Sequence, residues 1–210
     1  MFLYLIRHGE TDYNAEHRYQ GMYGESRLNE AGREQARALS SLLAPLRFDG
    51  VFCSTSHRTR ETLSLALPTL SEEDVTFLDE LRELDVGSLT DRLLAETMEK
   101  YPDFYAEQDE YKSDYSRFGG ESHEDMFSRA RHVLRILEQT NANHVAVVTH
   151  GAFLWHMIAV AAGLPVLNKK IPVDNCSVSV LELNEGKGTL RLLNVTAEGL
   201  ETFGAASSAV

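Results

Sequence analysis

Two short apolar runs, each followed at once by a histidine and a glycine, constrain the fold of this chain most strongly. Residues 2–6 lead into Arg7-His8-Gly9, and residues 145–148 lead into Thr149-His150-Gly151. An unbroken apolar run of this length is typical of a strand buried on both faces in a parallel sheet. Ligands of open α/β sheets bind beyond the carboxyl ends of the strands. We therefore expect His8 and His150 to meet at one site, where the two glycines let the backbone approach a ligand.

Helical and strand-like segments alternate along the chain, which predicts an α/β fold. Apolar residues recur at helical spacing in residues 29–44, 58–67, 121–140 and 153–162. Strands are expected at residues 2–6, 51–53, 75–78 and 145–148. Residues 177–183 and 189–195 alternate around a Glu-Gly-Lys-Gly turn and predict an edge hairpin near the C-terminus. We expect three α/β/α layers around a mostly parallel central sheet.

Residues 88–120 differ from the rest of the chain, because they are rich in acidic and aromatic residues and show weak periodicity. We interpret them as an inserted lid over one end of the sheet, within a single domain that spans residues 1–204. Gly119-Gly120 would be a hinge into the next helix, and residues 205–210 a loose tail. The lid tyrosines at 101, 105, 111 and 115 either face the leaving group or, as we favour, pack the insertion onto the core.

The charge balance limits the partners of this chain of 210 residues, whose formal net charge is −12. Nucleic acid and anionic membranes need a basic face, so neither is expected as a partner. Cys53 and Cys176 are too few for a disulfide framework and predict reduced thiols. The apolar residues 152–167 are too short and too interrupted to span a bilayer, and residues 1–6 are no signal peptide. We expect a cytoplasmic protein, either a monomer or a homodimer.

Several motifs occur in a fixed order. They are Leu-Ile-Arg-His-Gly-Glu-Thr-Asp-Tyr-Asn at 5–14, Arg-Tyr-Gln-Gly at 18–21, Leu-Asn-Glu-Ala-Gly at 28–32, Ser-x-x-x-Arg-x-x-x-Thr at 54–62, Leu-x-Glu-x-x-x-Gly at 81–87, Gly-Gly-Glu-Ser at 119–122 and Val-Val-Thr-His-Gly at 147–151. In this order the motifs resemble the histidine phosphatase superfamily, the phosphoglycerate-mutase-like proteins. The resemblance extends from residue 3 to about residue 155, and Asn175-Cys-Ser177 before the hairpin is similar to the end of the family pattern as well.

The resemblance implies that His8 is a nucleophile that forms a phosphohistidine, because a neutral imidazole has a free lone pair near pH 7. Its other ring nitrogen would donate to a backbone carbonyl. Arg7 and Arg58 would grip the phosphoryl oxygens through their planar forks and make a metal or cofactor unnecessary. His150, protonated in the substrate complex, would add a third donor. Glu83 would protonate the leaving alkoxide and then activate water, which for a carboxyl group near neutral pH needs a raised pKa.

The same resemblance implies that Asn14 and Gln20 supply neutral donors to the phosphoryl group, and that Gly21 and Gly151 belong to the phosphate-binding loops. Each assignment has a plainer alternative. Arg58 would fit a solvated helix face, Glu83 lies in a charged run, and Asn14 would fit a turn. The remaining histidines are expected to be structural or solvated: His17, His57, His123, His132, His144 and His156.

The sequence departs from the family pattern at the residues that would choose the substrate. Ser88-Leu-Thr-Asp91 replaces a Trp-Glu-Gly-like stretch, Thr59 replaces an alanine, and residues 24–27 lack the usual Asp and Pro. The compact chain and Gln20-Gly21 favour the phosphatase branch. We therefore expect a hydrolase of small phosphomonoesters. The alternatives are a bisphosphate-dependent phosphoglycerate mutase and a non-catalytic phosphate-binding protein.

Overall fold

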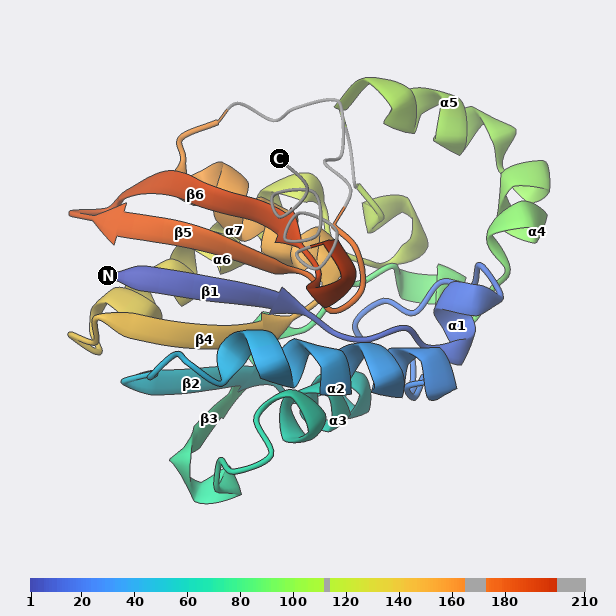
Figure 1. The fold of residues 1–210 in the computed structure, drawn as a ribbon. Coiled ribbons are helices and arrows are strands. Elements are labelled where there is room, and N and C mark those ends of the chain that lie inside the picture. The colour runs from blue at the N-terminus through green and yellow to red at the C-terminus, as the bar shows by residue number, and fades with distance from the viewer. Residues whose placement is uncertain (112–113, 165–172, 200–210) are drawn as a thin grey trace, which may run out of the picture.

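A six-stranded sheet forms the centre of the molecule in the computed structural model, which describes residues 1–111, 114–164 and 173–199, without the side chains of 107–111 (Figure 1). Its strands are β1 (Phe2–Arg7), β2 (Gly50–Ser54), β3 (Val75–Leu78), β4 (His144–Thr149), β5 (Val178–Asn184) and β6 (Lys187–Val195), in the order β3-β2-β4-β1-β5-β6. The first four of that order run parallel, whereas β5 and β6 form an antiparallel hairpin at one edge. The predicted fold class is confirmed.

Helices cover both faces of the sheet, which explains the unbroken apolar runs. Leu3 and Leu5 point to one face and pack with α6 (His123–Glu138) and α7 (Gly151–Ala161). Ile6 points to the other face and packs with α2 (Glu30–Leu43) and α3 (His57–Ala66). All three side chains are 0% exposed. The central strands therefore have no solvent face and place only their carboxyl ends at the surface.

The four predicted helices, α2, α3, α6 and α7, begin and end within about two residues of the predicted positions, as expected for sequence-based bounds. Asn29 caps α2 by accepting from the Gly32 N–H at 2.8 Å, and Ser122 caps α6 in a capping box with Asp125. Helix α7 begins at Gly151, two residues earlier than predicted, with His150 as its N-cap. The unpaired N–H groups of its first turn therefore lie directly beside His150.

Residues 152–161 of the apolar segment at 152–167 lie in α7, residues 162–164 follow the helix, and residues 165–167 lie outside the described residues. Within the described parts of the chain, no helix is both long and apolar enough to cross a membrane. Both cysteines are buried and carry free thiols, as predicted.

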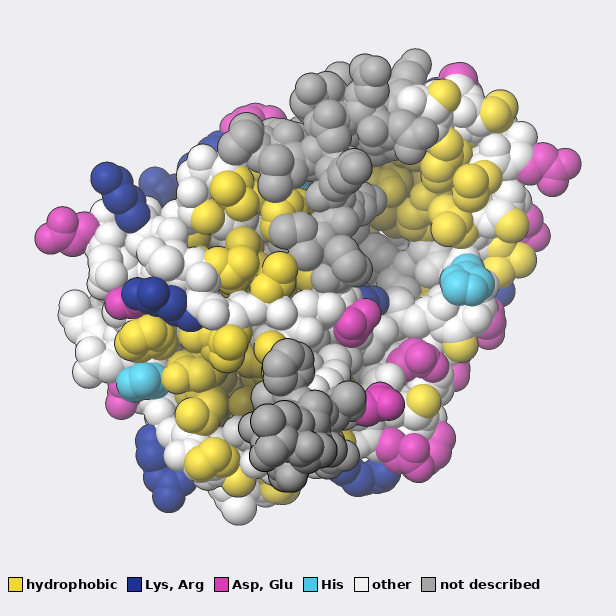
Figure 2. All heavy atoms as spheres, turned by 45° about the horizontal axis from the view of Figure 1, so that its top comes forward, with side chains coloured by type: hydrophobic (Ala, Val, Ile, Leu, Met, Phe, Trp, Pro, Cys, Tyr) yellow, Lys and Arg dark blue, Asp and Glu magenta, His cyan; other side chains and the backbone are white. Residues whose placement is uncertain are grey.

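The insertion at residues 88–120 contains α4 (Leu94–Lys100) and α5 (Pro102–Tyr111), which project beside α1 (Asp12–Ala15), near the ends of β1 and β4 (Figure 1). Hydrophobic side chains gather on this arm in the upper right of Figure 2. Phe104 is 3% exposed and makes edge contacts with Tyr105, Tyr115 and Phe118. Such contacts favour the packing interpretation of the aromatic residues. The Tyr111 side chain, residues 112–113 and the predicted tail at 205–210 lie outside the described residues.

Candidate active site

His8 follows β1 directly and is 2% exposed. Its backbone N–H donates to the Thr149 carbonyl at 3.0 Å, which ties the end of β1 to the end of β4. Its Nδ1 lies 2.7 Å from the Gly9 carbonyl oxygen. Because a carbonyl only accepts, Nδ1 carries the hydrogen and Nε2 keeps its lone pair. Burial, then the charges of Arg58 and Arg7, hold the pKa of His8 well below its ordinary value. The imidazole is therefore neutral at neutral pH.

His150 is fully buried, and its ring lies edge-on to that of His8, with 5.2 Å between the centroids. Its Nδ1 accepts from Arg58 Nε at 3.2 Å, and its Nε2 lies 2.9 Å from Ser54 Oγ. Burial and then the charge of Arg58 lower the pKa of His150 well below its usual range. His150 is thus neutral and supports Arg58. The predicted role of His150 as a third donor requires it to bind a proton, and on Nδ1 this would mean releasing Arg58.

Arg58 lies in the first turn of α3 and is 1% exposed, so the alternative of a solvated helix face is wrong. Its Nη1 donates to the Gly24 carbonyl at 2.9 Å, and its Nη2 donates to the Gly21 carbonyl at 3.0 Å. With His150, these acceptors use three of the five N–H groups of the guanidinium and leave two for a ligand. Burial lowers the pKa of Arg58 to about 10, which keeps it charged at neutral pH.

The Gly21 carbonyl holds Arg58 and cannot itself donate to a phosphate. Gly21 was predicted to belong to a phosphate-binding loop. Its carbonyl instead orients the guanidinium group of Arg58.

Arg7 ends β1 and donates through Nη1 to the Val173 carbonyl at 2.5 Å. Its Nε is buried and has no hydrogen-bond partner among the described residues. Because buried donors are nearly always paired, this N–H is available to an acceptor in the site. Burial lowers the pKa of Arg7, and the charges of Glu83 and Asp174 oppose that shift. Glu83 therefore lies close enough to Arg7 to act on it electrostatically.

The glycines after the two histidines allow close packing within the protein. A Cβ at Gly151 would lie 3.2 Å from Arg7 Nε, and a Cβ at Gly9 would lie 2.5 Å from the Gly32 carbonyl oxygen. The two glycines were expected to let the backbone approach a ligand. In the structure, Arg7 packs against Gly151, and the start of α2 packs against Gly9. Glycine at both positions lets the histidines stay at the strand ends without displacing these neighbours.

Glu83 is half-buried and lies at the N-terminus of α7. Its Oε1 accepts from the N–H groups of Leu84 at 2.9 Å and Phe153 at 3.1 Å, and its Oε2 accepts from the Ala152 N–H at 3.1 Å. The side chain of Asp79 in the same charged run is 77% exposed. The bonds to three backbone N–H groups therefore distinguish Glu83 from the exposed Asp79. The start of a helix is a favourable place for its negative charge.

The amides of Asn14 and Gln20 turn their oxygens toward the protein. Asn14 Oδ1 accepts from the Thr11 N–H at 3.2 Å, and Gln20 Oε1 accepts from the Ser26 hydroxyl. The Thr11 hydroxyl lies within reach of both amide oxygens, 3.0 Å from Asn14 Oδ1 and 3.1 Å from Gln20 Oε1, and can donate to either. This arrangement leaves the NH₂ end of each amide to serve as a donor. Asn14 also closes the capping box of α1 with Thr11, so the turn interpretation and the donor interpretation are compatible.

Sequence reasoning missed the supporting residues Ser54, Thr62 and Asn175. Ser54 holds His150, Thr62 Oγ1 accepts from the Gly9 N–H at 3.0 Å, and Asn175 Nδ2 donates to the His8 carbonyl at 2.9 Å. A signal for all three was present, because Ser54 and Thr62 are the two ends of the Ser-x-x-x-Arg-x-x-x-Thr element and Asn175 begins the Asn-Cys-Ser stretch before the hairpin.

Arg129 is a further missed residue, and no sequence pattern marks it. From α6 it donates to the carbonyls of Glu80 at 2.9 Å and Arg82 at 2.6 Å, and it pairs with Glu121 at 2.7 Å. These bonds brace the segment that carries Glu83.

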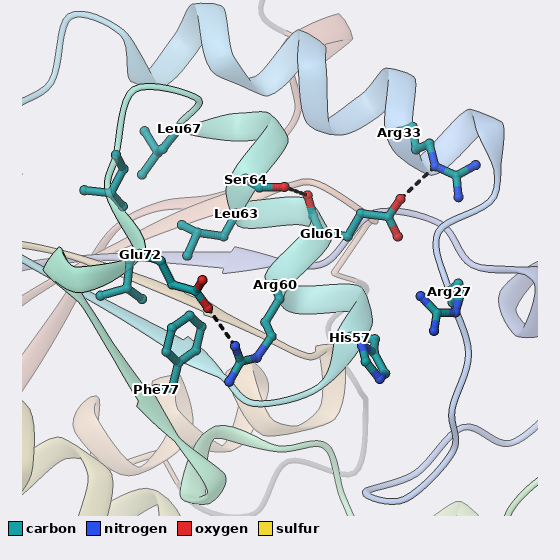
Figure 3. A pocket seen from close by; sticks show the side chains of 12 residues that line it. Arg27, Arg33, His57, Arg60, Glu61, Leu63, Ser64, Leu67, Glu72 and Phe77 are labelled. Atoms are coloured by element: carbon teal, nitrogen blue, oxygen red, sulfur yellow. Dashed lines mark hydrogen bonds and ion pairs between the residues drawn. The ribbon is translucent and has the colours of Figure 1, made fainter.

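A separate cavity of about 420 Å³ lies between α3 and β3 (Figure 3). Its charged side chains pair with one another, Arg33 with Glu61 at 2.7 Å and Arg60 with Glu72 at 3.0 Å. None of the predicted site residues lines it. Six of the predicted residues converge at the ends of β1 and β4, away from this cavity. We call them the two-histidine site: Arg7, His8, Asn14, Arg58, Glu83 and His150. Within the described ranges, no group of three or more His, Cys, Asp or Glu side chains could hold a metal ion.

Comparisons with known proteins agree with this geometry. A family model of the histidine phosphatase superfamily (branch 1) matches residues 3–196. The chain is 30% identical over 211 residues to Phosphoserine phosphatase 1 of Hydrogenobacter thermophilus, covering 99% of each protein. It is also 30% identical over 187 residues to "Probable phosphoglycerate mutase GpmB" of Salmonella paratyphi A, covering 88% of this chain and 86% of that protein.

The crystal structure of the alpha-ribazole phosphatase from Shigella flexneri has the same fold, with a TM-score of 0.79 at 30% identity over 93% of this chain and 96% of that one. The ordered motifs, the meeting of His8 with His150 and the match along nearly the whole chain lead to one assignment: the chain belongs to branch 1 of the histidine phosphatase superfamily.

Proposed function

We propose that this chain is a phosphomonoester hydrolase that acts on small phosphorylated metabolites through a phosphohistidine at His8. The observation that carries the proposal is the state of His8. Its hydrogen is fixed on Nδ1 by the Gly9 carbonyl, and its Nε2 lone pair lies in a buried site beside two guanidinium groups. A buried neutral imidazole with a fixed tautomer is a nucleophile, and arginines are suited to hold the phosphoryl group that it attacks.

In the first step, His8 Nε2 attacks phosphorus, and the bond between phosphorus and the leaving oxygen breaks. Arg7 Nε and the two free N–H groups of Arg58 stabilise the charge on the three equatorial oxygens. The Asn14 amide adds a neutral donor. In the complex with the dianionic substrate Glu83 carries a proton, which it gives to the leaving alkoxide, and the alcohol departs. The products are a phosphohistidine and an ionised Glu83 that returns to the N–H groups of α7.

In the second step, a water molecule attacks the phosphohistidine, and the bond between phosphorus and Nε2 breaks. Glu83 takes the proton of that water, so the carboxyl is protonated again for the next cycle. Inorganic phosphate leaves, and His8 recovers its lone pair. Each group thus ends the cycle in the protonation state in which it began.

Arg7 and Arg58 supply the positive charge that the transferring phosphoryl group needs, so we propose a reaction without a metal ion. Turnover should continue unchanged after exhaustive treatment with a chelator. Loss of turnover that added divalent cations restore would contradict this part of the proposal.

The mutase is the second candidate, because several relatives carry a mutase name. The phosphatase is favoured, because the relative named a phosphoserine phosphatase matches 99% of both chains, more than the relative with the mutase name. The two candidates differ in what removes the phosphoryl group from His8, which is water in one and a second substrate hydroxyl in the other. Interconversion of phosphoglycerates that depends on a bisphosphate would support the mutase.

The test is phosphate release from a panel of small phosphoesters by the wild-type protein and by His8→Ala. We expect release by the wild-type protein and a rate at least about a thousandfold lower in the variant, as for loss of a nucleophile. The matched control is His132→Ala, on an exposed position of α6. Equal release by the wild-type protein and His8→Ala would overturn the proposal.

A further inference from the structure

We propose that His123 and His156 form a subsite that binds hydroxyl groups on the leaving alcohol of the substrate. The inference rests on the proposed function and deepens it, because it names the class of phosphoester. It predicts that polyhydroxylated alcohols, such as those of glycerol and sugar phosphates, are preferred over apolar ones.

The two imidazoles lie together between the beginnings of α6 and α7. Their ring centroids are 5.3 Å apart, and the Phe127 ring contacts both, at 4.4 Å from His123 and 5.2 Å from His156. His156 is 3% exposed. The cluster is thus built from α6 and α7 and has an aromatic wall.

Three of the four ring nitrogens in the pair have no hydrogen-bond partner among the described residues. His156 Nδ1 lies 2.7 Å from the Ala152 carbonyl, but His156 Nε2 and both ring nitrogens of His123 are buried and unpaired. Leaving a buried polar atom unpaired costs stability, so native proteins rarely do so. If these two side chains only filled space, the protein would be more stable with phenylalanine at both positions. The unpaired nitrogens therefore point to a ligand.

The pair lies on the side of the site where Glu83 acts. Ala152 and His156 are one turn apart on the same face of α7, and the Ala152 N–H holds Glu83 Oε2 at 3.1 Å. The charge of Glu83 also acts on His156. Glu121, two residues before His123, accepts from the Asp85 N–H at 2.9 Å. Because Glu83 protonates the leaving oxygen in the proposed mechanism, we place the rest of the leaving alcohol on the side of Glu83 where this pair lies.

The positions of the hydrogens on the two imidazole rings determine which chemical groups the pair can bind. The Ala152 carbonyl fixes the hydrogen of His156 on Nδ1, so Nε2 can only accept. A neutral His123 offers one donor and one acceptor. A hydroxyl group can donate to one imidazole and accept from the other, whereas a carboxylate meets the Nε2 lone pair and is repelled. Burial lowers the pKa of both histidines, which keeps them neutral and agrees with this choice.

The test compares two substrates with the same three-carbon skeleton, glycerol 3-phosphate and n-propyl phosphate. In His156→Phe, which keeps a ring but removes the nitrogens, the ratio of kcat/KM for glycerol 3-phosphate to that for propyl phosphate should fall roughly tenfold, the loss expected for one buried hydrogen bond. His156→Gln, whose amide oxygen can accept near the position of Nε2, should recover part of the ratio. His132→Phe on the exposed face of α6 is the matched control. An unchanged ratio in His156→Phe would overturn the inference.

A binding measurement separates this inference from the proposed function. The His8→Ala protein, labelled in its histidine rings, is titrated with each phosphoester and followed by NMR. We expect the ring signals of His123 and His156 to shift with glycerol 3-phosphate and much less with propyl phosphate. This readout needs no turnover, so it still applies if the wild-type protein proves inactive. Equal shifts with both compounds, or none with either, would contradict the hydroxyl subsite.

Discussion

The two-histidine site and the insertion at residues 88–120 are built in different ways. In the site, backbone groups hold the functional side chains: the Gly9 carbonyl holds His8, the carbonyls of Gly21 and Gly24 hold Arg58, and three N–H groups hold Glu83. In the insertion, side chains hold one another through aromatic edges and hydroxyl pairs, such as Tyr105 with Tyr19 at 2.7 Å.

Backbone anchors depend on the fold itself, so the position of each anchored group cannot change without moving a strand end or a helix start. Contacts between side chains can be exchanged one residue at a time. The comparison indicates that the chemistry is fixed by the sheet and its helices, whereas the insertion is free to vary with the substrate.

After loss of His8 itself, Arg58→Lys should damage the site most severely. A single ammonium group cannot donate at once to Gly21, Gly24, His150 and a phosphoryl oxygen. We expect kcat/KM to fall by roughly 10²- to 10³-fold, the usual cost of a lost transition-state donor. Steady-state kinetics measure the effect, and Arg60→Lys, which lies on the same helix and pairs with Glu72, is the control. Wild-type activity in Arg58→Lys would show that the guanidinium fork is not needed.

Glu83→Gln tests the proton donor. The amide can still occupy the N-terminus of α7, but it cannot give a proton to the leaving oxygen. We expect kcat/KM to fall about 10²-fold for an alkyl phosphate. The loss should be much smaller for p-nitrophenyl phosphate, whose leaving group departs without a proton. The comparison of the two substrates is the measurement, and an equal loss for both would remove Glu83 from this role.

The buried histidines make stability depend on pH. The pKa values of His8 and His150 in the folded protein lie well below the ordinary value, so below about pH 6.5 the unfolded chain binds protons that the folded protein does not. Their contribution to stability is complete above that pH and declines as the pH falls. Between about pH 7 and about pH 5.5 we expect a loss of about 1 kcal/mol for each of these histidines.

Urea unfolding at both pH values measures this loss. His8→Ala should lose about 1 kcal/mol less than the wild-type protein over the same range, because one buried imidazole is gone. Tyr105→Phe in the insertion should show the wild-type dependence. Identical dependence in His8→Ala and the wild-type protein would contradict the neutral state assigned to His8.

Tyr105→Phe is the smallest expected change and tests the insertion directly. The Tyr105 hydroxyl pairs with the hydroxyls of Tyr19 at 2.7 Å and Thr97 at 2.6 Å, so its loss should lower the free energy of unfolding by about 1 kcal/mol. We expect kcat/KM to stay within about twofold of the wild-type value, as for a change outside the reacting groups. Tyr23→Phe, at a position that is 60% exposed, is the control. A tenfold loss of kcat/KM in Tyr105→Phe would mean that the insertion takes part in the chemistry.

Strands and helices that depend only on the residue pattern of their own segment were predictable from the sequence. Strands buried on both faces leave unbroken apolar runs, so β1 and β4 and the histidines at their ends followed from Phe2–Ile6 and Val145–Val148 alone. Helix α2 was equally clear, because Asn29 caps it and its apolar residues have helical spacing. The meeting of His8 and His150 then followed from the geometry of a parallel sheet.

Features that depend on distant contacts were not predictable. The burial of Arg58 depends on the carbonyls of Gly21 and Gly24, and the brace of the Glu83 segment depends on Arg129. The early start of α7 at Gly151, which exposes its N–H groups to Glu83, has no local signal either. These contacts join segments far apart in the sequence, and no residue pattern within one segment encodes them.

The most direct test of the central claim is a search for phosphate on His8. The protein is mixed briefly with a phosphoester labelled in its phosphoryl group, quenched in alkali, and digested for mass spectrometry. We predict label on the peptide that contains His8, stable in alkali and lost in acid, and none in His8→Ala. Rapid release of phosphate with no label on His8 at any time, together with full activity in His8→Ala, would contradict the account.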